Sequence, residues 1–328
     1  MRRTGFNHFK MKALYSASMF AVFFAVACQC TPVKVDDSYY LKPEPENNAN
    51  NSGKDSSDDG KPDTSTDYHQ GYTLVWADEF EGSALNTDDW NVEVNGNGGG
   101  NNELQYYRAE NVTVENGSLV LTAKIESYKG KQFTSGRLNT SKKHFFTHGI
   151  IESSIRLPKT ANGLWPAFWM LGNDFSEVGW PRCGEIDILE MGNSGGISSG
   201  HQETYFNGAC HWGFYKDGAY PNYAKSSNAP YSIQDGDYHL FTLIWDEEAV
   251  SMYLDLDKNP SVEPYFKMNI VDTNGDWAVG NYFHHDHFIV YDLAVGGRFT
   301  GILSPSGITA LDNGPARMCI DYVRVYQK

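Results

Sequence analysis

The sequence is short of positive charge. Its 328 residues include 26 Lys and Arg against 41 Asp and Glu, which gives a formal net charge of −15. Such a chain has no overall field that attracts phosphates, and its basic residues are scattered along the sequence. We therefore expect no nucleic-acid partner. The sequence also lacks a P-loop, a CxxC pair and a dinucleotide-binding glycine fingerprint, which argues against the functions that those motifs mark.

Cysteine is scarce as well, with five residues in the whole chain. Cys28 and Cys30 lie close to the N-terminus, which leaves Cys183, Cys210 and Cys319 for the rest. Three cysteines cannot all pair, so either one disulfide forms or all three are buried thiols. A domain of about 260 residues can bury enough core to need no disulfide.

Long apolar runs are absent except at residues 13–27, ALYSASMFAVFFAVA. This run is shorter than the ~20 residues that a membrane-spanning helix needs. Four basic residues and no acid precede it, which is typical of a secretory signal. We predict a signal peptide over residues 1–27, with Met1 or Met11 as its start.

The signal ends in Ala25-Val26-Ala27-Cys28, which suits two kinds of processing. Ordinary cleavage after Ala27 would release the protein. The same ending is similar to a bacterial lipoprotein signal, in which the Cys carries the lipid. We favour the lipoprotein, because residues 28–70 are polar and nearly free of apolar side chains, as in a disordered tether. The expected location is the outer membrane or cell surface, through Cys28, with secretion as the alternative.

Strand-like patterns fill residues 71–328. Short apolar runs are separated there by Gly, Asn, Asp and Pro, and some alternate with the period of two that is typical of strands. The clearest runs are 119–125, 149–157, 238–245, 250–256, 288–295 and 320–326. We find no helical pattern beyond the signal and no repeat. The sequence therefore predicts an all-β domain, a two-sheet β-sandwich of the jelly-roll type.

Residues 184–190, GEIDILE, are the most informative segment. On a regular strand Glu185 and Asp187 share one face, whereas Glu190 falls on the core face. An unpaired carboxylate buried in the core costs several kcal/mol. A one-residue bulge near Ile188–Leu189 removes this conflict by turning Glu190 to the side of the other two acids.

Three carboxylates on one face repel one another, so the pattern indicates a cation site or a catalytic site. Calcium loops wrap around their ion, whereas a strand presents its acids in a row. Glycoside cleavage needs two carboxyl groups, about 5–5.5 Å apart when the anomeric configuration is retained. We therefore favour catalysis over a calcium site and over a solvated acidic face.

GEIDILE and several further motifs together resemble glycoside hydrolase family 16, in the bulged form of its laminarinase-like members. In chain order, the other motifs are WADEF at 76–80, NNELQYY at 101–107, SGR at 135–137, GLWPAFWML at 163–171 and IDYVRVY at 320–326. The resemblance covers nearly all of 71–328 and implies a concanavalin A-like jelly roll with a catalytic role.

The resemblance also implies a role for each acid. Glu185 is the expected nucleophile, Asp187 orients and tunes it, and Glu190 protonates the leaving oxygen and later activates water. Expected sugar contacts are made by Asn102, Glu103, Arg137, Trp165, Trp169, His211 and Trp212. Of these, His211 is expected to touch the acid/base end of the site. Core packing is the alternative for the tryptophans, whose rings otherwise suit stacking on sugars.

Two further sets of residues suggest ligands. His284, His285, Asp286 and His287 look like a metal cluster, but only His285 and His287 share a strand face, so we expect them to line the cleft or lie on the surface. The resemblance implies no cofactor for catalysis. It does imply a structural calcium, held by Glu79, the Gly117 carbonyl and Asp321.

Two positions differ from the family pattern. Asp292 stands where similar proteins commonly have Asn, and Phe299 stands where they commonly have Trp. The first adds charge near the expected cleft, and the second offers a smaller stacking face.

The sequence as a whole predicts a monomeric, retaining endo-β-glucanase that acts on β-1,3- or mixed β-1,3/1,4-glucan. A galactan hydrolase of the same fold is the first alternative, although sulfated galactans would need more basic groups than this acidic domain offers. The second is a glycan-binding lipoprotein without activity, which would have no need for three repelling acids.

Overall fold

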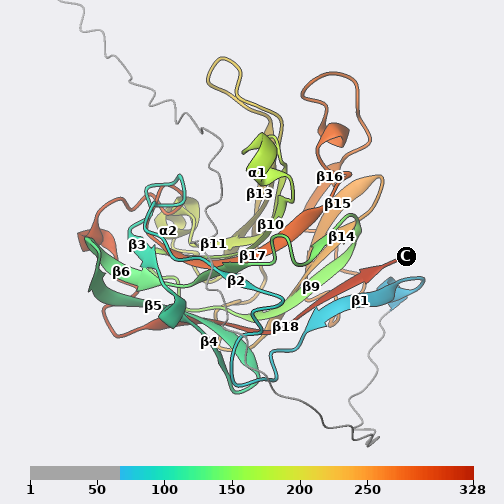
Figure 1. Ribbon diagram of the computed structural model, residues 1–328. Coiled ribbons are helices and arrows are strands. Elements are labelled where there is room, and N and C mark those ends of the chain that lie inside the picture. The colour runs from blue at the N-terminus through green and yellow to red at the C-terminus, as the bar shows by residue number, and fades with distance from the viewer. Residues whose placement is uncertain (1–66) are drawn as a thin grey trace, which may run out of the picture. The chain divides into compact units, whose positions relative to one another are not determined.

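The computed structural model describes residues 67–328 (Figure 1). The predicted signal peptide, Cys28 and the tether as far as residue 66 lie outside the described residues. Within residues 67–328, no helix combines the length and apolar character needed to cross a membrane.

One of the two sheets has ten strands, in the order β16-β15-β14-β9-β18-β5-β6-β3, with β1 paired to β18 and β4 to β5. The pairs are antiparallel except β3 with β6. The strands are β1 (Thr73–Asp78), β3 (Gln105–Tyr107), β4 (Val112–Glu115), β5 (Ser118–Tyr128), β6 (Lys131–Ser135), β9 (Gly149–Arg156), β14 (His239–Trp245), β15 (Ala249–Leu254), β16 (Phe266–Asn269) and β18 (Ala316–Gln327).

The other sheet has eight antiparallel strands, in the order β13-β12-β11-β10-β17-β7-β2, with β8 paired to β17. Its strands are β2 (Asn91–Val92), β7 (Arg137–Asn139), β8 (Phe145–Phe146), β10 (Leu164–Gly172), β11 (Glu185–Met191), β12 (Tyr205–His211), β13 (Asn222–Asn228) and β17 (His287–Val295). This sheet carries the predicted catalytic segment as β11.

Helices in the described part are few and short. The α-helices are α1 (Phe175–Val178) and α2 (Ser194–Ser199), and the 3₁₀ turns are Asp67–His69, Ala109–Asn111, Val279–Asn281 and Pro305–Gly307. The turn at Asp67–His69 precedes β1, and the other elements lie in the connections between strands. The absence of a strong helical pattern in the sequence agrees with this distribution.

Apolar side chains from both sheets meet in one core. Phe168 and Ile186 of the eight-stranded sheet and Ile151, Phe241 and Val323 of the ten-stranded sheet are fully buried in it. Burying one apolar face of each sheet is what holds a sandwich together. The all-β two-sheet sandwich is therefore confirmed.

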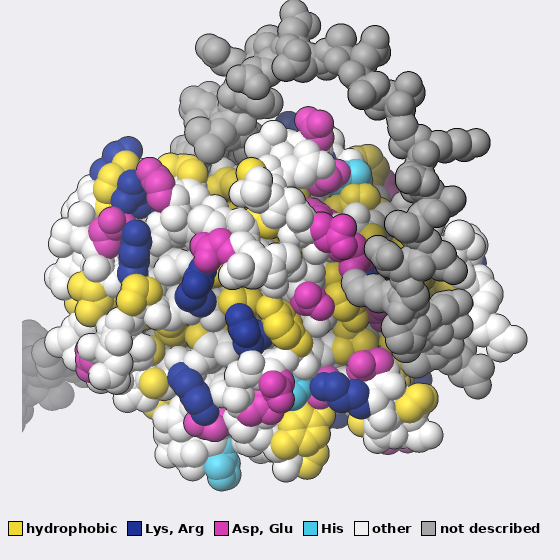
Figure 2. Space-filling view, turned by 90° about the horizontal axis from the view of Figure 1, so that it is seen from below, with side chains coloured by type: hydrophobic (Ala, Val, Ile, Leu, Met, Phe, Trp, Pro, Cys, Tyr) yellow, Lys and Arg dark blue, Asp and Glu magenta, His cyan; other side chains and the backbone are white. Residues whose placement is uncertain are grey.

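Charges of both signs are scattered over the outer face of the ten-stranded sheet. Figure 2 shows Lys and Arg side chains interspersed with Asp and Glu on this side of the molecule. Ion pairs account for part of the pattern, among them Arg317 with Glu115 and Arg324 with Glu79. In the part of this side that Figure 2 leaves uncovered, the basic side chains have acidic neighbours and do not form a stripe of one sign.

The three cysteines of the domain, Cys183, Cys210 and Cys319, are buried and free. The sequence left open one disulfide or three buried thiols, and the structure has three buried thiols. The large core makes a disulfide unnecessary.

Candidate active site

The bulge predicted from GEIDILE is present in β11. The register with β10 shifts between Phe168 and Trp169, and the register with β12 shifts between Asp187 and Glu190. The first shift leaves Ile188 as the extra residue, and the second sets Ile188 and Leu189 against Gly208; both of these β11 side chains are fully buried in the core. The bulge thus lets Asp187 and Glu190 share a face, as expected when a buried unpaired acid would be costly.

Tyr265 supports the bulge from inside the core. Its hydroxyl donates to the carbonyl of Ile188, the extra residue. A bulge interrupts the ladder of backbone hydrogen bonds. The Tyr265 hydroxyl therefore gives the buried Ile188 carbonyl a hydrogen-bond partner that it would otherwise lack.

Each outer carboxylate has its own indole donor. Trp180 Nε1 donates to Glu185 Oε2 at 3.1 Å, and Trp165 Nε1 donates to Glu190 Oε1 at 3.0 Å. The Trp165 ring is itself stacked on Phe299, with ring centroids 4.6 Å apart and planes 15° from parallel. These contacts orient both carboxylates, and they show that Phe299 supports Trp165 directly.

His211 lies at the Glu185 end of the group. It sits opposite Glu185 in the β11–β12 pair, with Nε2 4.0 Å from Glu185 Oε1 and 3.3 Å from Asp187 Oδ2. The Tyr220 hydroxyl is 3.2 Å from the other ring nitrogen. The expectation that His211 touches the acid/base end is therefore wrong, because the strand register places it beside the expected nucleophile.

Burial and mutual repulsion raise the pKa of all three acids. Burial, with a further contribution from Asp187, raises the pKa of Glu185 to about 8. The same two causes hold the pKa of Glu190 well above its usual range. Burial and then the charge of Asp292 raise the pKa of Asp187. At neutral pH the three carboxyls therefore share fewer than three charges, which leaves a proton for a general acid.

Asp292 organises a second group of polar residues on the same face. It is buried, and it accepts a hydrogen bond from Trp169 Nε1 at 2.7 Å. The guanidinium of Arg137 lies 5.0 Å from the centre of the Trp169 ring, and its Nε donates to Glu93 at 3.0 Å. Trp169 is thus held by a carboxylate at its edge and a cation at its face.

The remaining predicted sugar contacts are not all brought together. Asn102 is exposed in a turn with φ of 58°. Glu103 is buried and accepts hydrogen bonds from Gln105 at 2.6 Å and Tyr107 at 3.1 Å, so it acts as a support for the loop. Trp212 packs against the core and donates to the Trp277 carbonyl at 2.9 Å. Its predicted role in the cleft is therefore wrong, because it points away from the face that carries His211.

The His-rich segment does not form a metal cluster. His284 bonds His148 at 2.9 Å, His285 bonds the Cys183 carbonyl at 2.9 Å, and Asp286 accepts from Thr147 at 2.6 Å. His287 is fully buried, and burial lowers its pKa to about 3. Within the described part of the chain, the metal-type ligands that cluster are Glu185, Asp187 and His211.

The residues expected to hold calcium lie on β18 and on two nearby loops. Both carboxylate oxygens of Glu79 accept hydrogen bonds from Arg324, at 2.8 and 3.0 Å. An ion would have to displace this guanidinium, so Glu79 as placed does not fit the role. Gly117 lies in the β4–β5 turn and Asp321 on β18. The calcium site stays a prediction, and no step of the reaction depends on it.

Sequence reasoning missed several residues around the acids. Trp180 and Glu93 are hydrogen-bonded to predicted site residues but lie outside the motifs. Asn207 of β12 sits opposite Glu190, is 7% exposed, and donates to Ser226 Oγ at 2.9 Å, while its Oδ1 has no partner among the described residues. A buried acceptor of this kind suits a ligand hydroxyl. The position of Asn207 next to Glu190 follows from the pairing of β11 with β12 and has no motif in the sequence.

Comparison with known proteins agrees with this arrangement. Residues 46–181 match the family model described as "Beta-glucan synthesis-associated protein SKN1/KRE6/Sbg1". The "Clotting factor G alpha subunit" of Tachypleus tridentatus is 37% identical over 259 residues, which are 78% of this chain and 34% of that protein. The chain therefore spans about a third of that relative. The "Beta-glucanase" of Rhodothermus marinus is 33% identical over 262 residues, 78% of this chain and 85% of that protein.

A solved structure extends the likeness to the fold. The family 16 enzyme of the Bacteroides ovatus mixed-linkage glucan locus, bound to the product G4G4G3G, is 37% identical with a TM-score of 0.67. The match covers 77% of this chain and all of the other. With the bulged acid strand in place, and with the Rhodothermus and Bacteroides proteins matched at 33% and 37% identity over 85% and 100% of their length, the chain belongs to glycoside hydrolase family 16.

Proposed function

We propose that this chain is a retaining, endo-acting β-glucanase that cleaves β-1,3- or mixed β-1,3/1,4-linked glucan. The observation that carries the proposal is the bulged strand β11. It presents Glu185, Asp187 and Glu190 together, with a separate indole donor on each outer acid. Two carboxyl groups in different environments are what a double displacement at an anomeric carbon requires.

The reaction follows from the two environments. Glu185 reacts in its ionised form and attacks the anomeric carbon while Glu190 gives its proton to the leaving oxygen; the neighbouring His211 opposes the rise in the pKa of Glu185. The bond to the leaving sugar breaks and a glycosyl ester forms on Glu185. Glu190, now ionised, takes a proton from water, whose oxygen attacks the same carbon and releases Glu185. Two inversions retain the configuration.

The substrate class is supported by the relatives and by the charge of the cleft. The Rhodothermus protein is named a β-glucanase, and the Bacteroides enzyme belongs to a mixed-linkage glucan locus. Around the catalytic acids lie Glu93 and Asp292, with Arg137 as the neighbouring cation. Acids in this number favour a neutral polysaccharide over a sulfated one.

A digest of laminarin, barley mixed-linkage glucan and agarose tests the proposal. We expect oligosaccharides of several lengths from one or both glucans and none from agarose. Activity on agarose alone would replace the glucan assignment by the galactan alternative. Binding of laminarin without any new reducing ends would show a binding protein. The product profile on barley glucan also shows which linkage the site accepts.

For the N-terminal part we propose a lipid anchor on Cys28 that holds a monomeric domain at the cell surface. The small-x-small ending before Cys28 and the polar tether behind it support this proposal. In a bacterial host, Cys28→Ser should move the protein from the membrane fraction to the soluble fraction. An unchanged membrane share would contradict the anchor and leave the catalytic proposal untouched.

A further inference from the structure

The hairpin between β12 and β13 has two different faces. In Figure 1 it rises above the eight-stranded sheet (yellow). Lys216 and Ala219 exchange backbone hydrogen bonds at 2.8 and 3.1 Å, which closes a two-residue turn at Asp217-Gly218. Both turn residues have positive φ, as tight hairpin turns require. The hairpin is therefore a defined structure, and the side chains before its turn have definite directions.

The first face belongs to the active site. Tyr215 and Tyr220 pack against Trp180, with ring centroids 6.0 and 4.8 Å from it. Trp180 in turn donates to Glu185. This face of the hairpin thus forms part of the wall on the Glu185 side of the cleft.

The second face points away from the acids. The ring of Phe214 lies 5.9 Å from that of Trp277, on the loop between β16 and β17, and the guanidinium of Arg182 lies 4.6 Å from the centre of the Phe214 ring. Trp212 at the base of the hairpin donates to the Trp277 carbonyl at 2.9 Å, which ties the two loops together. The spacing between hairpin and loop is therefore held by hydrogen bonding as well as packing.

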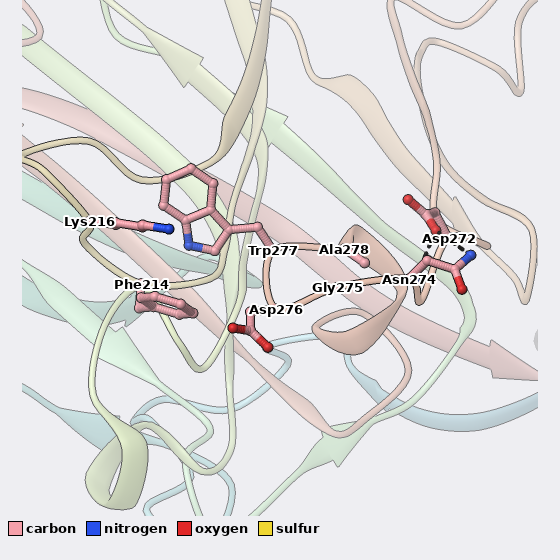
Figure 3. Close-up of a pocket in the computed structure, with 8 residues that line it drawn as sticks. All are labelled: Phe214, Lys216, Asp272, Asn274, Gly275, Asp276, Trp277 and Ala278. Atoms are coloured by element: carbon pink, nitrogen blue, oxygen red, sulfur yellow. Dashed lines mark hydrogen bonds between the residues drawn. The ribbon is translucent and has the colours of Figure 1, made fainter.

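A hollow of about 470 Å³ lies between the hairpin and this loop (Figure 3). Its lining includes Phe214, Lys216, Asp272, Asn274, Asp276 and Trp277. None of these residues belongs to the catalytic group. The volume falls within the range of small-molecule sites, ~300–1,000 Å³.

The lining suits a neutral sugar. Aromatic rings of Phe214 and Trp277 offer apolar surface for the faces of a pyranose ring. Asp272 and Asp276 supply acceptors for hydroxyl groups. The Trp277 indole N–H is buried and has no hydrogen-bond partner among the described residues. The lining carries two acids and one lysine, and Arg182 lies against the Phe214 ring, so the hollow has no excess of positive charge that would favour a sulfated or phosphorylated ligand.

We propose that this hollow is a second glucan-binding site, outside the catalytic cleft, that takes one or two glucosyl units of a neutral β-glucan. Because the hairpin is the common wall, a polymer bound at the hollow is held close to the catalytic acids. Such a site raises the local concentration of polymer and does nothing for a substrate too short to reach both places. The identity of the ligand rests on the proposed function.

Two substitutions in the full-length protein test the site, Trp277→Ala and Asp276→Ala. Asp276 is exposed, so its loss is not expected to disturb the fold. We expect the KM for laminarin or barley glucan to rise about fivefold with Trp277→Ala and less with Asp276→Ala, with kcat unchanged and hydrolysis of a glucan tetrasaccharide unaffected. Retardation in a native gel that contains the same glucan should weaken in parallel. Ile125→Ala, an exposed apolar side chain on β5, is the matched control.

The outcomes separate the two proposals. An unchanged KM and unchanged gel retardation in both variants would overturn the second site. Equal loss on polymer and tetrasaccharide would overturn it too, because the residues would then act on the cleft itself. If the unaltered protein neither hydrolyses nor binds the glucans, the proposed function fails instead.

Discussion

Glu185→Gln and Glu190→Gln are each expected to lower the release of oligosaccharides from β-glucan by about 10³-fold or more. The amide of Gln cannot attack an anomeric carbon, and it cannot give a proton to the leaving oxygen. Reducing-end assays on barley glucan measure the loss. Full activity in either variant would contradict the assignment of the two acids.

An activated aryl glycoside distinguishes the two roles. Its phenolate leaves without protonation, so Glu190→Gln should still form the glycosyl ester and release a burst of phenol. Glu185→Gln should release none, because it lacks the nucleophile. A burst from Glu185→Gln and none from Glu190→Gln would reverse the roles.

Thermal melting shows whether these variants fold. The raised pKa of Glu185 also predicts whether the melting temperature of Glu185→Gln rises or falls. Glu185 titrates at about 8 in the folded protein against an ordinary 4.5. Its folded form binds a proton that the unfolded chain releases, so stability is lost as pH rises from about 4.5 to 8. Glu185→Gln removes this loss. We expect the variant to melt higher than the unaltered protein at pH 8 and close to it at pH 4.

Asp187→Asn carries the second large effect, a loss of about 10²-fold in kcat/KM together with an acid shift of the whole pH profile. The charge of Asp187 is the second cause, after burial, of the raised pKa of both Glu185 and Glu190. Without that charge both acids ionise at lower pH. The acid limb, where Glu185 gains a proton, and the alkaline limb, where Glu190 loses one, both move down. Plots of kcat/KM against pH measure both limbs.

Asp292→Asn is the matched control for that shift. Asn keeps an oxygen for the Trp169 indole, which now donates to Asp292 at 2.7 Å, and the charge of Asp292 acts on Asp187 rather than on the outer acids. Without the charge of Asp292, Asp187 ionises more readily and repels the outer acids at least as strongly, so no acid shift is expected and any small shift should be toward higher pH. If Asp187→Asn slows the reaction and leaves both limbs in place, Asp187 acts by position and not by charge.

The fold and the catalytic strand could be predicted because their causes are local. Alternation within runs such as 149–157 indicates strands wherever one face is buried. The spacing in GEIDILE sets Glu190 against the core unless the strand bulges, so the cost of a buried carboxylate predicts the bulge before any partner strand is known. The structure has that bulge at Ile188.

The surroundings of the acids could not be predicted in the same way. His211 touches Asp187 and Glu185 because the register of β11 and β12 places it there, whereas the next residue, Trp212, packs against the core. Trp180 reaches Glu185 from the loop before β11. Each of these contacts joins two segments that are brought together by the strand order and register of the whole sheet.

The sequence by itself determined the class of fold, the three acids and the family, since alternation, spacing and motif order are properties of the chain. The tertiary structure decided which indole meets which acid, that Asn207 leaves a buried acceptor beside Glu190, and that the β12–β13 hairpin encloses a hollow on its far side. Those features rest on strand register and loop packing. Both are set by the burial of many side chains that are far apart in the sequence, so neither can be predicted from a short segment.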